Sequence, residues 1–192
     1  MLLAATRRFL DDQSCEQLAP FLAEWPAISS SRDTPPSSLP VLRHLPATAG
    51  HTIFSTADLA ATLRQHSDAC AWRQTYAAAD LPPEFLDNYG WTELIGQRGP
   101  TASDRIACGF LLLGPATHYP SHRHAAEEIY VPLAGTAAWQ RGDANWQDQP
   151  PGTRIHHPSW MLHAMRTHAT PLLALYLWRG GDLAQKSVFT GN

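Results

Sequence analysis

Residues 122–130 read HRHAAEEIY and bring two histidines, a glutamate and a tyrosine close together in the chain. On an extended strand, residues two apart share a face, so His122 and His124 are expected to point the same way. Glu128 and Tyr130 form a second such pair after a short turn. Two imidazoles and a carboxylate that converge inside a barrel make a site for a divalent transition metal.

The spacing around these residues is more specific than the histidines alone. It reads HxHxxxExxxxxxG from His122 to Gly135, and GxxxxxPxxxxH from Gly152 to His163. His163 is the best candidate for a fourth ligand. The two patterns are the motifs of the cupin superfamily, which the chain therefore resembles. The resemblance implies a small antiparallel β-barrel of the jelly-roll type. It also implies four metal ligands: His122, His124, Glu128 and His163.

The predicted ligand set leaves the identity of the metal open. Imidazole and carboxylate suit several divalent ions, among them Zn²⁺, Fe²⁺ and Mn²⁺, so we expect one such ion. Two positions depart from the second cupin motif: Trp160 replaces a usual glycine, and Thr167 replaces a usual asparagine. Neither departure changes a ligand.

The sequence before residue 101 is typical of helices. Residues 2–25 carry leucine and aromatic side chains at roughly helical spacing, which predicts one helix. Residues 27–50 are rich in Ser, Pro and Thr and are interpreted as a connection. A second helix is predicted from residue 55 to about 79, and a third from 84 to about 89.

From residue 101 onward, short apolar or alternating runs are separated by Gly, Pro, Asp and Asn, which predicts a sandwich or barrel. The expected fold is mainly β, with a helical N-terminal segment at 1–100 that packs on a cupin jelly-roll antiparallel β-barrel at 101–192. The predicted strands are Ile106–Leu113, Glu128–Leu133, Thr136–Gln140, Thr153–His156, His163–Thr167 and Leu172–Trp178.

The composition of the chain indicates which kinds of binding partner and which cellular location to expect. The formal net charge is −3 and there is no run of Lys or Arg, so a nucleic-acid partner is not expected. No apolar run approaches the ~20 residues that a membrane span needs. Cys15, Cys70 and Cys108 lie far apart, which favours reduced thiols over disulfides. Acidic residues soon follow the apolar start, unlike a signal peptide, so we expect a cytoplasmic protein.

Longer segments point to one branch of the cupins. THYPSHRHAAEEIY at 117–130, RIHHPSWMLHAM at 154–165 and LLALYLWRG at 172–180 are similar to the cupin-type dimethylsulfoniopropionate (DMSP) lyases of marine bacteria. The similarity covers roughly residues 80–183. It implies a carbon–sulfur lyase that cleaves DMSP to acrylate and dimethyl sulfide by β-elimination, with the substrate carboxylate bound to the metal.

The same resemblance implies roles for several aromatic residues. The family's catalytic base is a tyrosine in the EIY segment, which corresponds to Tyr130. A free phenol has a pKa of about 10, so the metal must lower it. Tyr119 is a second candidate, to orient substrate or assist proton transfer. The sulfonium cation needs an aromatic wall. The candidates for that wall are Trp178, Tyr176, Trp160 and Trp139.

Other histidines are expected to stay outside the ligand set. His156 and His157 are neighbours on one predicted strand and must face opposite ways, so at most one of them reaches the site. His118 and His168 are interpreted as loop or surface residues. Arg123, between two inward ligands, should point outward, where a structural salt bridge is its expected role.

Two other functions remain open from the sequence. Another metal-dependent cupin enzyme, such as an iron-dependent dioxygenase that acts on a small carboxylate, could use the same ligands. A non-enzymatic metal-binding cupin module is the second alternative, although such a module would have no reason to keep Tyr130 beside the metal. The expected partner is a small-molecule substrate. Cupins often pair through barrel edges, so a homodimer is also open.

Overall fold

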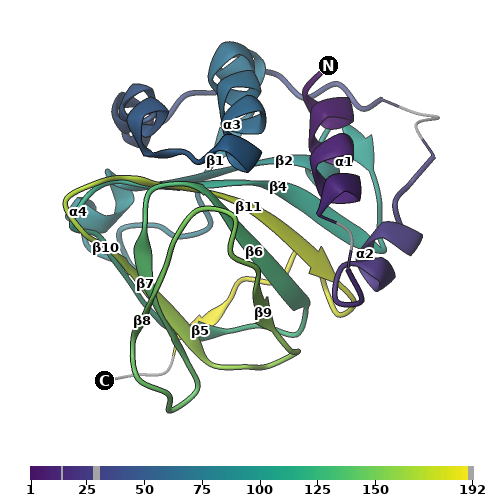
Figure 1. Cartoon of the computed structure of the whole chain (residues 1–192). Helices are drawn as coiled ribbons and strands as arrows, with labels where there is room; N and C mark the ends of the chain where they lie inside the picture. Colours follow the sequence, from purple (N-terminus) through teal and green to yellow (C-terminus); the bar gives the residue numbers. More distant parts are fainter. Residues whose placement is uncertain (14, 28–30, 190–192) are drawn as a thin grey trace.

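A computed structural model describes residues 1–13, 15–27 and 31–189, and its strands form two facing sheets (Figure 1). The large sheet contains, in spatial order, β1 (Trp72–Arg73), β2 (Tyr89–Gly96), β4 (Ile106–Leu113), β11 (Leu172–Arg179), β6 (Glu127–Ala134) and β9 (Ile155–His157), with β3 (Thr101–Ala102) beside β2. The small sheet contains β12 (Val188–Phe189), β5 (His118–Arg123), β10 (His163–Thr167), β7 (Ala137–Arg141) and β8 (Gln147–Gln149). Neighbouring strands are antiparallel except for β2 and β3.

The large sheet is buried on both faces, and β4 shows how. Its even-numbered residues, such as Phe110 and Leu112, join a core beneath the helices. Its odd-numbered residues, such as Ala107 and Leu111, point into the barrel. A strand covered on both sides has no polar face, which is why β4 reads as a continuous apolar run.

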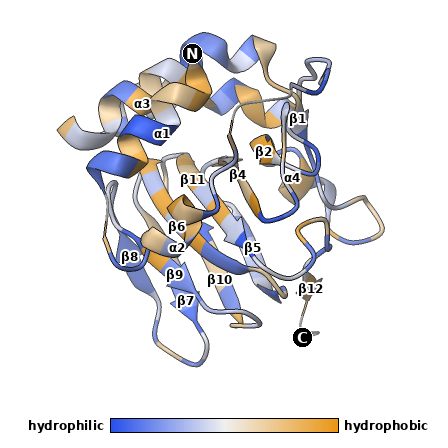
Figure 2. Ribbon diagram, turned by 90° about the vertical axis from the view of Figure 1, so that its right-hand side faces the viewer, coloured by the Kyte–Doolittle hydropathy of each residue, from blue (hydrophilic) through white to orange (hydrophobic). Residues whose placement is uncertain are grey.

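Helices cover the outer face of the large sheet (Figures 1 and 2). They are α1 (Leu2–Asp12), α2 (Ala19–Ala23) and α3 (Phe54–His66). Leu10 of α1 and Leu63 of α3 are fully buried against strand residues such as Ile129. Shorter helical turns are η1 (Pro40–His44), η2 (Pro46–His51), η3 (Ser67–Ala69) and α4 (Pro83–Leu86). Within the described ranges, no helix combines the length and apolarity that a bilayer crossing requires.

The predicted helices are longer than the observed ones. The helix predicted over 2–25 is two helices, because Pro20 is tolerated in the first turn of α2 but would break the interior of one long helix. The helix predicted to residue 79 ends at His66, and Trp72 lies in β1 instead. Ser14 and residues 28–30, which belong to the predicted first helix and connection, lie outside the described residues.

The mainly β prediction is confirmed, but the strands begin earlier than residue 101. The six predicted strands correspond to β4, β6, β7, β9, β10 and β11, and the bounds of β4 and β10 agree. β2 pairs with β4 along the sheet, so residues of the predicted helical segment also contribute a strand to the barrel. Tyr89, predicted to end a helix, begins β2, because α4 stops at Leu86. His118, predicted as a loop or surface residue, begins β5 and is exposed at the surface.

Candidate metal centre and active site

Four side chains converge between the two sheets. His122 lies near the end of β5 and His124 just after it, whereas His163 begins β10 and Glu128 lies in β6. All four are at most 2% exposed. The three histidines offer ring nitrogens within 4.8 Å of one another. Glu128 Oε2 is 3.2 Å from His124 Nε2 and 3.3 Å from His163 Nε2.

Backbone carbonyl groups fix the orientation of the three rings. His122 Nδ1 lies 2.8 Å from the Pro120 carbonyl oxygen, and His124 Nδ1 and His163 Nδ1 each lie 2.9 Å from a carbonyl oxygen. A carbonyl oxygen only accepts, so each Nδ1 donates and each Nε2 keeps a free lone pair. This arrangement is typical of metal-bound histidines, whose second nitrogen is held by an outer partner.

The electrostatics of the cluster suit a metal ion. Burial acts to raise the pKa of Glu128, but the electrostatic attraction of His124 and the other imidazoles beside it holds that pKa well below its usual value. Burial lowers the pKa of His122 well below its usual value. Metal binding needs a charged carboxylate and neutral imidazoles, and the lowered pKa values of Glu128 and His122 favour these two states. His163 Nε2 is buried without a hydrogen-bond partner among the described residues, as an unfilled ligand atom would be.

His157 is a further imidazole at this cluster. Its Nδ1 lies 3.2 Å from Glu128 Oε2, and its ring stacks on His163 at 3.9 Å between centroids. Burial, followed by the charge of His163, lowers its pKa to about 4. His156 faces the other way and pairs with Glu127 at 2.8 Å. The prediction that at most one of these two histidines reaches the site is therefore confirmed.

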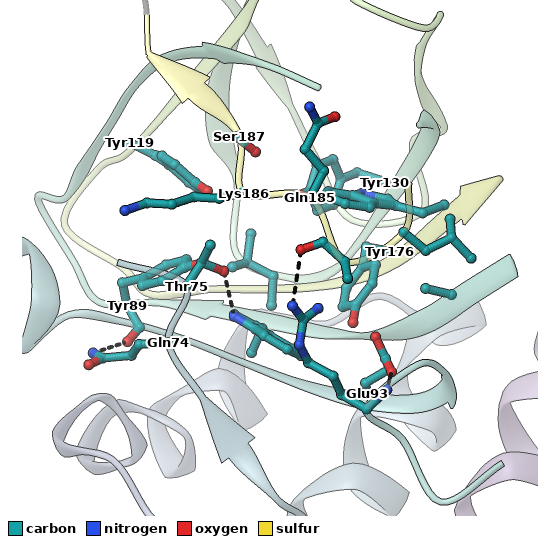
Figure 3. Close-up of a pocket in the computed structure, with 17 residues that line it drawn as sticks. Gln74, Thr75, Tyr89, Glu93, Tyr119, Tyr130, Tyr176, Gln185, Lys186 and Ser187 are labelled. Atoms are coloured by element: carbon teal, nitrogen blue, oxygen red, sulfur yellow. Dashed lines mark hydrogen bonds between the residues drawn. The ribbon is translucent and has the colours of Figure 1, made fainter. Parts of the chain in front are cut away.

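A cavity of about 210 Å³ adjoins the cluster inside the barrel (Figure 3). Trp178 lines it, stacks on His124 at 4.1 Å and donates from Nε1 to Glu128 Oε1 at 2.5 Å. Tyr119 also lines it and stacks on His122 at 4.2 Å. The cavity wall is therefore in direct contact with the candidate ligands, on a scale that suits a small molecule.

Tyr130 and Tyr176 face this cavity from neighbouring strands, β6 and β11. Tyr130 is 6% exposed, and its ring lies 6.0 Å from that of His157. Burial, and then the negative charge of Glu128, raise the pKa of Tyr130 well above its usual value. A phenol in this position needs a nearby cation before it can act as a base.

Two predicted wall residues do not reach the cavity. Trp160 lies after β9 with φ of 62° and a 48% exposed side chain, and it is absent from the described lining. The backbone N–H of Trp160 donates to the His124 carbonyl oxygen. The turn therefore holds the backbone of a ligand residue, while the Trp160 ring faces solvent. Trp139 is buried in the barrel core. Arg123 is exposed, as predicted, and has no ion pair in the described part of the chain.

Sequence reasoning missed one side of the cavity. Tyr89, Trp91 and Glu93 lie at alternate positions of β2 and line it together. Their period of two was a usable signal, but residues before 101 were interpreted as helical. Tyr76 was missed as well, and its hydroxyl lies 2.7 Å from that of Tyr119.

Comparisons with a family model and with a curated protein both point to dimethylsulfoniopropionate lyases. A family model of dimethylsulfoniopropionate lyases matches residues 14–174. Dimethylsulfoniopropionate lyase DddQ of Ruegeria pomeroyi is 41% identical over 119 residues, which are 62% of this chain and 59% of that protein. The match therefore spans less than two thirds of that relative's length.

Solved structures resemble the whole fold. The crystal structure of DMSP lyase DddQ from Ruegeria pomeroyi superposes with a TM-score of 0.88 at 32% identity, and covers 98% of this chain and 94% of that one. A cupin-2 domain from Rhodospirillum rubrum superposes with a TM-score of 0.51 at 18% identity, and covers 64% of this chain and 76% of that one. The latter supports the cupin fold alone.

Proposed function

The chain belongs to the dimethylsulfoniopropionate lyase family, and from this membership we propose that it cleaves DMSP to acrylate and dimethyl sulfide. One observation carries the proposal: Trp178 joins the buried ligand cluster to the aromatic cavity. It lines the cavity, donates a hydrogen bond to Glu128 and stacks on His124. A carboxylate at the cluster would leave the rest of a small substrate among Tyr130, Tyr176 and Trp178.

We assign the metal to His122, His124, Glu128 and His163. When bound, a divalent ion supplies a Lewis acid for the substrate carboxylate and lowers the pKa of the neighbouring phenol. Tyr130 takes the α-proton of the substrate. The electron pair of that C–H bond forms the Cα=Cβ double bond, the Cβ–S bond breaks, and its pair leaves on sulfur as neutral dimethyl sulfide. Acrylate and one proton are the other products.

Other side chains hold the substrate for this step. Tyr119 is proposed to orient it, since its hydroxyl is itself fixed by Tyr76 at 2.7 Å. Tyr176 and Trp178 are proposed to bind the sulfonium, because aromatic faces attract cations by about 0.5–2 kcal/mol. Trp160, exposed at 48%, takes no part in this wall.

The test is headspace detection of dimethyl sulfide from DMSP with metal-reconstituted protein, together with acrylate and dissolved oxygen. We expect equimolar dimethyl sulfide and acrylate without oxygen consumption. Oxygen uptake coupled to substrate loss would indicate a dioxygenase instead. His163→Ala is the control, because loss of one ligand should remove both stoichiometric metal and turnover.

Finer assignments belong to the same proposal. Zn²⁺, Fe²⁺ and Mn²⁺ are the proposed metals, to be distinguished by elemental analysis and by the activity each restores. A cytoplasmic location in a bacterium is supported by Cys15, Cys70 and Cys108, which are free thiols. A homodimer is supported by the exposed apolar side chains of Ile53 and Phe54, and size-exclusion chromatography with light scattering tests it.

A further inference from the structure

Glu93 is a buried carboxylate in the cavity wall that the proposed elimination does not use. It lines the cavity and is 6% exposed. Its Oε1 accepts the backbone N–H groups of Arg98 and Gly99 at 2.6 and 2.7 Å. In the described part of the chain, its Oε2 has no hydrogen-bond partner. The side chain is therefore anchored by one oxygen and has the other available for a ligand.

The sheet register places Glu93 in one row with the proposed base. Tyr130 pairs with Tyr176, Tyr176 with Gly109, and Gly109 with Glu93. Residues that pair directly across strands lie on the same face, and each strand adds roughly 4.8 Å. Glu93 thus lies two strands beyond Tyr176, on the side away from β6 and its proposed ligand Glu128.

The position between Tyr176 and Glu93 carries no side chain. A Cβ on Gly109 would meet the Thr92 carbonyl oxygen at 2.0 Å, so glycine is required there. The cavity floor between the aromatic ring and the carboxylate is therefore bare backbone. Figure 3 shows Tyr176 and Glu93 on the same side of the cavity, with the Tyr176 hydroxyl turned toward the Glu93 end.

Within the described residues Glu93 forms no ion pair, although the charges of Arg98 and Arg73 act on it from a greater distance. Arg98 directs its guanidinium to the Ala184 carbonyl oxygen at 3.0 Å, and lies 5.8 Å from the Trp91 ring. Lys186, also at the cavity, pairs with Asp80 at 2.5 Å. Burial of a carboxylate without a close partner costs free energy, which a ligand cation at Oε2 would offset. Burial accordingly raises the pKa of Glu93, and the two N–H groups and the arginine charges, which act to lower it, only partly offset that rise.

We propose that Glu93 determines specificity by binding the positively charged group of the substrate. The inference rests on the proposed function, since a substrate with its carboxylate at the metal ligands would extend its sulfonium across Tyr176 toward Glu93. The aromatic wall attracts a cation only weakly and also packs against neutral groups, whereas a carboxylate discriminates between them by charge. Glu93 thus selects small carboxylates that carry an onium group at the other end.

The test compares two unreactive ligands of the same shape. 3-(Trimethylammonio)propanoate carries the cation, and 4,4-dimethylpentanoate replaces its nitrogen by carbon. Their dissociation constants are measured by calorimetry on metal-loaded protein. We expect Glu93→Gln, whose amide oxygen can still accept the two N–H groups, to weaken the cationic ligand about tenfold. Binding of the neutral ligand should stay within about twofold.

Two further variants complete the design. Glu93→Asp withdraws the charge by one methylene and should weaken the cationic ligand selectively but less, which keeps the test valid if Glu93→Gln does not fold. Glu24→Gln removes a carboxylate outside the cavity and should change neither constant. Equal losses for both ligands, or no loss, would overturn the inference. If the wild type releases no dimethyl sulfide yet shows Glu93-dependent preference for the cation, only the proposed lyase function fails.

Discussion

At the scale of single residues, Tyr130 has two opposing requirements. It must lose its proton to act as a base, while burial and the charge of Glu128 raise its pKa. A cation held by the neighbouring ligands would reverse this shift, so base and metal site are expected to work only together. The close placement of Glu128 and Tyr130 on β6 is the structural reason for that dependence.

We expect Tyr130→Phe to reduce turnover of DMSP by about 10²-fold or more, because general-base catalysis contributes at least that much. Metal content, measured by elemental analysis, should stay unchanged, since no ligand is lost. The matched control is Tyr89→Phe, which removes another cavity hydroxyl, bonded to Thr75. It should keep most of the rate. Full turnover in Tyr130→Phe with metal bound would show that another group is the base.

His157 supports the ligand Glu128 through its Nδ1. Removal of an outer partner of a metal ligand typically weakens binding by about 10–100-fold. We therefore expect His157→Ala to raise the metal dissociation constant by that factor, as measured by competition with a chelator. His156→Ala is the matched control, because the ring of His156 is next in the chain but pairs with Glu127 outside the cluster. Equal effects of the two substitutions would argue against this specific support.

At the scale of elements, α1 joins the apolar core between the helices and the large sheet through buried side chains such as Leu10. Leu10 is fully buried in the core that the helices share with β2, β4, β6 and β11. We expect Leu10→Ala to lower the free energy of unfolding by about 2–5 kcal/mol, as for other buried leucines. Urea denaturation measures it. Arg8→Ala, on the exposed side of the same helix, should change it by less than about 0.5 kcal/mol.

Strand prediction succeeded where an apolar or alternating run was bounded by turn residues. Ile106–Leu113 and His163–Thr167 agree with β4 and β10 for this reason. The prediction missed β2 because Pro82 and Gly90 suggested a helix that ends at Gly90, whereas α4 ends at Leu86 and the strand begins at Tyr89. β5 was not among the predicted apolar runs, because its residues are mostly polar: Tyr119 and His122 are buried at the site, whereas His118 and Arg123 are exposed, so a hydrophobic pattern is absent.

The candidate site was predictable to the extent that its residues follow a fixed spacing. The ligand positions depend on two strands with known periodicity, so His122 and His163 could be placed near each other. The orientation of Trp160 could not be predicted, because it depends on a backbone φ of 62°, which residues other than glycine rarely adopt. Glu93 alternates with Tyr89 and Trp91 on β2. Its place in one row with Gly109 and Tyr176, however, follows only from the pairing of β2 with β4.

At the scale of the whole molecule, the large sheet separates two tasks. Its outer face forms a continuous apolar core with the helices, whereas its inner face carries tyrosines and the ligand Glu128. Polar groups buried on the inner face cost free energy without bound metal, and the helix-covered face offsets that cost through apolar burial. Stability and function therefore depend on opposite faces of the same strands.

This separation predicts an acid-labile metal-free protein. Burial lowers the pKa of His157 from about 6.5 to about 4, and lowers that of His122 in the same direction. In unfolded chains these histidines bind protons near pH 6.5, so stability is fully present above that pH and falls as the pH drops toward 4. His157 alone accounts for up to about 3 kcal/mol of this loss. Urea denaturation of chelator-treated protein at pH 5, 6, 7 and 8 measures it. A free energy of unfolding that stays constant from pH 7 to 5 would contradict the neutral, buried state of the cluster.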